Sequence, residues 1–173
     1  MRILALDQSL SNTGWALWNT GDAIPQSGAW PLCDGGRNRA HGFVAIHREI
    51  NAIHAAGAID LIAHETPLKL PTDKVAQLIG TYGLISHIES IACIKRITMM
   101  SIDQQDWRST WFNGMRYSGR EDWKRAAIER CRQFDMDPSS DDEAEACGIL
   151  DHVMHMQKIT PPWRIANPLV SPV

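Results

Sequence analysis

The sequence has few cysteines, and none is placed to build a disulfide framework or a zinc site. The four cysteines lie far apart and form no Cys-x-x-Cys pair; they are Cys33, Cys93, Cys131 and Cys147. Widely spaced single cysteines are typical of reduced thiols in a cytosolic protein, whereas disulfide frameworks and zinc sites need paired spacings. We therefore expect a cytoplasmic protein.

Long apolar runs are also absent. The apolar stretches are short and broken by polar residues, whereas a membrane-spanning helix needs about 20 consecutive apolar residues. The first apolar stretch meets a carboxylate at Asp7, too early for a secretory signal. We therefore expect no membrane partner. With 173 residues, of which 44 % are hydrophobic, the chain is long enough for one domain with a substantial core.

Positive charge is in short supply overall. Lys and Arg number 17 against 20 Asp and Glu, so the net charge is −3, which at first sight argues against a nucleic-acid partner. The distribution is uneven, however. Residues 108–132 contain seven basic and three acidic residues, while residues 133–157 contain seven acidic residues and no Lys or Arg. This asymmetry favours a basic contact surface beside an acidic site, although two solvated helix faces would produce it as well.

The hydrophobic pattern predicts an α/β fold. Three short apolar segments typical of strands come first, and longer segments of helical periodicity then alternate with further strands. The expected strands are 3–7, 15–18, 27–32, 59–64 and 96–102, and the expected helices are 37–56, 74–94, 121–134 and 141–157. This order predicts a mixed five-stranded sheet, a three-strand antiparallel meander plus parallel strands, flanked by helices on both faces.

Two segments are expected outside these elements. Residues 104–119 hold aromatics flanked by polar residues, which predicts an exposed connection. Prolines gather from residue 161 onward, which predicts an extended arm. We therefore divide the chain into one domain at 1–158 and a Pro-rich C-terminal tail at 159–173.

Carboxylates occupy positions where they could converge. Asp7 closes the first expected strand and Glu65 the fourth, while Asp142 and Glu145 share one face of the last helix. Neighbouring strands lie about 4.8 Å apart, so carboxylates at their ends can meet. Such a cluster repels itself unless hard cations such as Mg²⁺ or Mn²⁺ bind, and two ions about 4 Å apart suit phosphodiester hydrolysis. Singly, each acid could instead belong to a loop or stabilise a helix dipole.

The opening segment resembles a known family. The letters ILALDQSLSNTGWAL are similar to the first hairpin of the RuvC Holliday-junction resolvases, in the RNase H-like (retroviral integrase) superfamily. Asp7, Thr13 and Gly14 fall in register with that family's strand, Asp, turn and Thr-Gly.

Two later segments extend the resemblance over roughly residues 1–157. DLIAHE delivers Glu65 at a strand end, and the run Asp142-Glu143-Ala144-Glu145-Ala146 is similar to the family's Asp-x-Ala-Asp-Ala helix start. The family implies an RNase H-like fold for residues 1–158. It also implies a metal-dependent endonuclease that resolves four-way (Holliday) junctions by phosphodiester hydrolysis.

The resemblance also implies site residues and partners. The metal-binding catalytic set would be Asp7, Glu65, Asp142 and Glu145, holding two Mg²⁺ or Mn²⁺ ions. Lys124 would lie near the scissile phosphate, unless it is an ordinary surface lysine. No small-molecule cofactor is implied. Branched DNA would contact Arg37, Arg39, Arg48, Arg116, Arg120, Lys124 and Arg125.

Cutting both strands of a junction needs two active sites, so we expect a homodimer. The second long helix, with its Gly80 and Gly83, is the candidate interface.

Several residues depart from the family pattern and favour a phage-type member. Glu145 replaces the usual Asp, the turn at Gln8-Ser9 lacks Pro-Gly, and Leu68 stands where a base-stacking aromatic is common. Stacking could come from other aromatics, although packing or dimer roles are the more common use of such residues: Trp107, Trp111 and Phe112. Two alternatives therefore remain: an RNase H-like nuclease for other branched, flap or RNA-containing substrates, and a non-catalytic nucleotide- or DNA-binding module.

Overall fold

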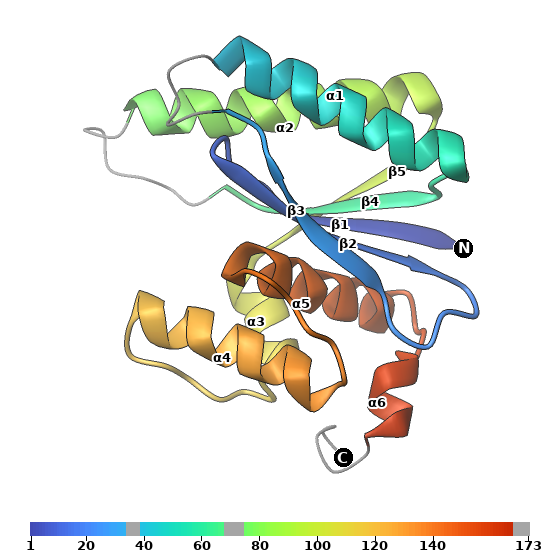
Figure 1. Cartoon of the computed structure of the whole chain (residues 1–173), viewed down its shortest axis with the longest axis vertical. Coiled ribbons are helices and arrows are strands. Elements are labelled where there is room, and N and C mark those ends of the chain that lie inside the picture. Colours follow the sequence, from blue (N-terminus) through green and yellow to red (C-terminus); the bar gives the residue numbers. More distant parts are fainter. Residues whose placement is uncertain (34–38, 68–74, 168–173) are drawn as a thin grey trace.

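A computed structural model describes residues 1–33, 39–67 and 75–167 and contains a five-stranded mixed sheet with helices on both faces (Figure 1). The strands are β1 (Arg2–Asp7), β2 (Asn12–Asn19), β3 (Gln26–Pro31), β4 (Leu61–Glu65) and β5 (Thr98–Ile102). The helices are α1 (Arg39–Ala56), α2 (Val75–Lys95), α3 (Gln104–Trp111), α4 (Arg120–Gln133), α5 (Asp141–Met156) and α6 (Pro162–Ala166). The predicted fold class is confirmed.

The strand pairing brings the carboxyl ends of β1 and β4 to one edge of the sheet. The strand order is β3-β2-β1-β4-β5, with antiparallel pairs among β1, β2 and β3 and parallel pairs from β1 to β4 and from β4 to β5. Leu6 lies opposite His64 in the parallel register, so the next residues, Asp7 and Glu65, end neighbouring strands together. This register determines where the candidate site forms.

Each face of the sheet packs against its own set of helices. Figure 1 shows α1 and α2 on one face and α3 to α6 on the other. Because side chains alternate along a strand, Leu4 and Leu6 join the core beneath α1 and α2, while Ile3 and Ala5 join the core around α5. A strand buried on both faces explains why β1 is a continuous apolar run.

Residues 104–111 form helix α3, so the prediction of an exposed connection over this stretch is wrong. Trp107, Trp111 and Phe112 are at most 1 % exposed and belong to the core around α5. A Cβ on Gly148 of α5 would come within 2.9 Å of the Trp107 ring, so the glycine makes room for that ring. The two Trp residues, four apart, form one face of a helix, and all three aromatics are packing residues that are closed to DNA bases.

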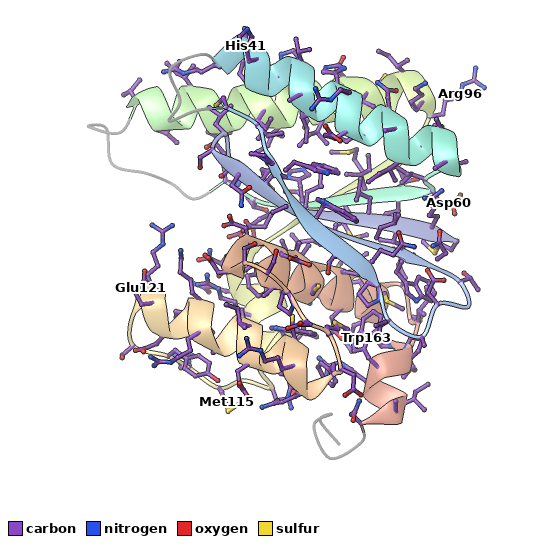
Figure 2. All side chains as sticks on the ribbon, viewed as in Figure 1. His41, Asp60, Arg96, Met115, Glu121 and Trp163 are labelled. Atoms are coloured by element: carbon purple, nitrogen blue, oxygen red, sulfur yellow. The ribbon has the colours of Figure 1, made fainter. Side chains whose placement is uncertain are left out.

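The C-terminal segment also differs from the prediction. Instead of an extended arm, residues 162–166 form α6, because a proline is well tolerated in the first turn of a helix. Trp163 is 1 % exposed and donates from Nε1 to Asp151 Oδ1 at 2.9 Å, while Arg164 Nη2 lies 2.7 Å from Asp151 Oδ2. Figure 2 shows Trp163 between α6 and the rest of the domain.

The glycines of helix α2 allow close packing against other elements of the same chain. A Cβ on Gly83 would lie 2.7 Å from the Phe43 ring of α1, and one on Gly80 would lie 2.3 Å from Leu10 of the β1–β2 turn. The two glycines therefore serve close packing within this chain, and the dimer interface on α2 stays a prediction. Exposed apolar side chains lie elsewhere on α2, at Ile79 and Tyr82.

In the described residues, every helix is too short or too polar to cross a bilayer.

Candidate metal centre

Three of the four predicted carboxylates meet at the edge where β1 and β4 end. Asp7, Glu65 and Glu145 each offer an oxygen, and these oxygens all lie within 4.8 Å of one another. The first two close parallel neighbouring strands, and the third lies on α5, which packs against β1 and β4. The group could hold a metal ion.

Asp142 stands apart from this three-carboxylate cluster. It lines the same pocket, but its Oδ2 accepts a hydrogen bond from Asn12 Nδ2 at 2.6 Å. The structure therefore places the fourth predicted ligand beside the cluster, with its carboxylate bound to the start of β2.

Gly14 lets the start of α5 lie against the sheet. A Cβ at this position would come within 1.9 Å of the carbonyl oxygen of Asp142 and within 2.8 Å of the backbone nitrogen of Glu143. Any side chain would push the acidic turn of α5 away from β2. The glycine of the hairpin motif is therefore required for the close approach of α5 to β2 at the site.

Glu143 stabilises the N-terminal end of α5 through hydrogen bonds of its backbone and its side chain. The N-cap residue Ser140 accepts from Glu143 N at 3.2 Å. The Glu143 carboxylate is 5 % exposed and accepts from Ser27 Oγ of β3 at 2.7 Å and from Ser139 N at 2.8 Å. This residue of the acidic run is therefore engaged in structure, while its neighbours face the pocket.

Gln8 joins the ends of β1 and β4. Its side chain donates from Nε2 to the carbonyl of Glu65 and accepts at Oε1 from Glu65 N at 3.1 Å. Both bonds are buried. The turn residue that departs from the family's Pro-Gly pattern thus holds the backbone of one candidate ligand beside another.

Burial and mutual repulsion shift the pKa values of the clustered acids upward. The pKa of Asp7 is raised well above its usual range by burial and by the charges of Glu145 and Glu65. Burial, with the charge of Glu145, raises the pKa of Glu65 to about 7, although Arg108 opposes the shift. Burial also raises the pKa of Glu145, against Arg108. The positive charge of Arg108 therefore offsets the negative charge of the cluster only in part.

Arg108 is the functional candidate that sequence reasoning missed. Its Nη2 lies 3.3 Å from Glu145 Oε1, and its guanidinium carbon lies 5.2 Å from the Trp107 ring centre and 4.8 Å from that of Trp123. Both distances are within the range of cation–π interactions, so the two rings restrain the guanidinium. The available signal was a basic residue six positions after the last residue of the fifth strand, but the predicted exposed connection obscured it.

Lys124 lines the same pocket from α4. Its Nζ lies 2.6 Å from Asp141 Oδ2, and this hydrogen bond raises the pKa of Lys124. Arg120, at the start of α4, lines the pocket too, and Figure 2 labels the next residue, Glu121. We refer to Arg108, Arg120 and Lys124 as the basic wall of the pocket.

The other predicted DNA-contacting residues lie outside the pocket lining. Arg48 on α1 is exposed and pairs with Glu49 at 2.6 Å, and Arg125 on α4 pairs with Asp122 at 2.6 Å. Arg39, at the start of α1, is half-buried and Arg116 is exposed. Two further positions fall outside the described residues: Arg37 and Leu68.

Comparison with known proteins supports the fold. Neither a protein-family model nor a curated protein matches the sequence. Among solved structures, Thermus thermophilus RuvC in complex with a Holliday junction substrate matches with a TM-score of 0.69 and 9 % identity, over 91 % of this chain and 96 % of that chain.

Two resolvases from other sources match as well. The fowlpox virus Holliday junction resolvase has a TM-score of 0.58 at 11 % identity, covering 92 % of this chain and 100 % of that one. The yeast mitochondrial resolvase has a TM-score of 0.55 at 10 % identity, covering 97 % and 84 %. This chain therefore has the RuvC-like fold that bacterial, viral and mitochondrial Holliday junction resolvases share.

Proposed function

We propose that this protein is a metal-dependent endonuclease that resolves four-way DNA junctions by hydrolysing phosphodiester bonds. The observation that carries the proposal is the three-carboxylate cluster of Asp7, Glu65 and Glu145, at the carboxyl edge of a sheet with the RuvC-like fold. RuvC of this fold has been solved with a Holliday junction substrate, which supports branched DNA as the ligand.

The cluster suits a hard divalent cation. It offers carboxylate oxygens alone, it is largely buried, and its pKa values are raised by burial and mutual repulsion. Oxygen ligands of this kind fit Mg²⁺ or Mn²⁺. Asp7, Glu65 and Glu145, with Asp142, would hold two ions. When bound, such ions polarise the phosphate and lower the pKa of attacking water.

The basic wall supplies positive charge opposite the acids. The guanidinium of Arg108 can donate two parallel hydrogen bonds to a phosphate, and Lys124 can act as a point charge. Trp107 and Trp123 restrict how far Arg108 can move. A DNA strand in the pocket would thus lie with its phosphate between carboxylates and cations. Arg116 and Arg125 would contact phosphates outside the pocket, as would Arg39 and Arg48 if the DNA reaches α1.

Symmetric cutting of two strands requires a second copy of the site. The described part of the chain contains one such carboxylate cluster, so the proposal includes a homodimer. The outer face of α2 is the candidate surface, because Val75, Ile79 and Tyr82 follow one another at helical spacing and are each at least 50 % exposed.

A substrate comparison tests the proposed function. The protein is incubated with a synthetic four-way junction and with matched linear and flap duplexes, in Mg²⁺, Mn²⁺ or EDTA. We expect paired symmetric nicks in the junction alone, and none in EDTA. Equal cutting of every substrate would instead support an RNase H-like nuclease of broader range, and metal-dependent binding without cutting would support a non-catalytic module.

A further inference from the structure

The proposed function leaves one short contact at the site unexplained. Asn12 begins β2, and its Nδ2 donates to Asp142 Oδ2 at 2.6 Å across 130 residues of sequence. An amide that bonds a carboxylate at this distance makes a strong, charge-assisted hydrogen bond. Asp142 is also the acid that stands outside the three-carboxylate cluster.

Asn12 is held in place by its own turn. Its backbone N–H donates to Ser9 Oγ at 3.2 Å, and Ser9 Oγ donates to the Asn12 carbonyl at 2.6 Å. Buried Thr13 donates from Oγ1 to the Ser9 carbonyl at 2.8 Å. Since the turn is cross-linked at three points, the Asn12 amide starts from a defined backbone position.

The partner helix is fixed relative to that turn. The backbone of Asp142 lies so close to Gly14 that a Cβ there would be 1.9 Å from the Asp142 carbonyl oxygen. Both ends of the hydrogen bond therefore belong to one backbone contact between β2 and α5. With the backbone fixed, only the side-chain torsions of Asp142 are free to vary, and the hydrogen bond from the Asn12 amide selects one orientation of the carboxylate.

We propose that Asn12 is a positioning residue that holds the carboxylate of Asp142 in the pocket, beside the three-carboxylate cluster, as a further ligand for the divalent cation. The inference rests on the proposed metal-dependent function. By binding Oδ2, the amide leaves the other carboxylate oxygen available as a ligand. A neutral donor does this without adding a cation that would compete with the metal. Outer-shell partners of metal ligands commonly contribute about 10-fold to 100-fold to metal affinity.

The test measures Mn²⁺ binding to the full chain without DNA. Binding is measured by calorimetry and by the electron paramagnetic resonance signal of free Mn²⁺. We expect Asn12→Ala to weaken Mn²⁺ binding by about 10-fold to 100-fold. Asn19→Ala is the matched control, because Asn19 at the other end of β2 donates from Nδ2 to Asp22 Oδ2, also at 2.6 Å. It should bind Mn²⁺ like the wild type. Asn12→Leu, of similar shape, serves if the alanine variant does not fold.

A double-mutant cycle tests whether Asn12 acts through Asp142. In the Asp142→Ala background, Asn12→Ala should cause no further loss of Mn²⁺ affinity. The inference is overturned if Asn12→Ala and Asn12→Leu bind Mn²⁺ like the wild type, or if the loss is the same in both backgrounds. Failure of the proposed function looks different: the wild type would not bind Mn²⁺, or Asp7→Asn would bind it unchanged.

Discussion

Helix α5 carries two buried carboxylate environments that are built in opposite ways. Near its C-terminal end, Asp151 is fully buried and accepts from Trp163 Nε1 at 2.9 Å and from Arg164 Nε and Nη2 at 2.8 and 2.7 Å. Near its N-terminal end, Glu145 belongs to a cluster of three carboxylates, and Arg108 approaches it at 3.3 Å.

The difference shows how charge serves structure and function in one helix. A buried acid that stabilises the fold is matched by donors from the same chain, as Asp151 is by α6. The three-carboxylate cluster keeps excess negative charge, and burial together with this charge raises the pKa values of Asp7 and Glu65. Buried negative charge that the chain's own cations do not fully match is typical of a ligand-binding site.

The largest expected effect comes from removing one carboxylate of the cluster. Asp7→Asn should abolish junction cutting, by about a thousandfold or more, because metal ions contribute several kcal/mol of transition-state stabilisation. Junction binding should persist, as measured by gel shift. Asp137→Asn, at an exposed position on the approach to α5, is the matched control and should cut normally. Normal cutting by Asp7→Asn would mean that the metal site is wrongly assigned.

Removing Asp151, the carboxylate that is paired with Arg164, should instead reduce stability and leave activity nearly unchanged. Asp151→Ala takes the carboxylate from buried Arg164 and should lower the free energy of unfolding by about 3–5 kcal/mol. Urea denaturation measures the loss. Cutting per folded molecule should change little, since Asp151 lies outside the lining of the metal pocket. A stable Asp151→Ala protein with lost activity would contradict this division of roles.

The stability of the three-carboxylate cluster should also depend on pH. The pKa of Glu65 is about 7 in the folded chain against 4.5 as its ordinary value. The folded state therefore binds more protons between these values, and metal-free stability should fall as pH rises through them, by up to about 3 kcal/mol. Added Mn²⁺ should remove the fall, because it replaces the protons.

The measurement is the difference in free energy of unfolding between the wild type and Glu65→Gln, from about pH 5 to about pH 8. The difference is needed because burial lowers the pKa values of His64 and His152, and both proteins share that contribution. If the difference in free energy of unfolding does not depend on pH, the pKa of Glu65 is not raised in the folded protein.

The smallest effect should come from the cation of the cluster. Arg108→Ala removes a phosphate donor and should slow junction cutting by about 10-fold to 100-fold, the equivalent of about 1.4–2.7 kcal/mol. It should also tighten Mn²⁺ binding, because a competing positive charge is lost. Arg125→Ala, from an exposed ion pair, is the control. Weaker Mn²⁺ binding in Arg108→Ala would assign Arg108 a purely structural role.

Part of the site followed from local sequence signals. Asp7 and Glu65 each end an apolar strand, and the acids of α5 lie three apart on a helix, so their types and elements could be predicted. Arg108 could not be identified in this way. Its role depends on Trp123, fifteen positions along the chain, and on α3, a helix in the segment for which the sequence pattern predicts an exposed connection.

The sequence by itself determined the order of strands and most helices, and which acids could become ligands, because periodicity and strand ends are local properties. Tertiary structure alone decided that Asp142 turns to Asn12 while three other acids meet, and that Gly80 and Gly83 face inward. Tertiary structure also decided that the charge of Asp151 is matched by Arg164, whereas the charge of the three-carboxylate cluster is not fully matched. These outcomes depend on distances between residues far apart in the chain, and electrostatic energy depends on those distances and on burial.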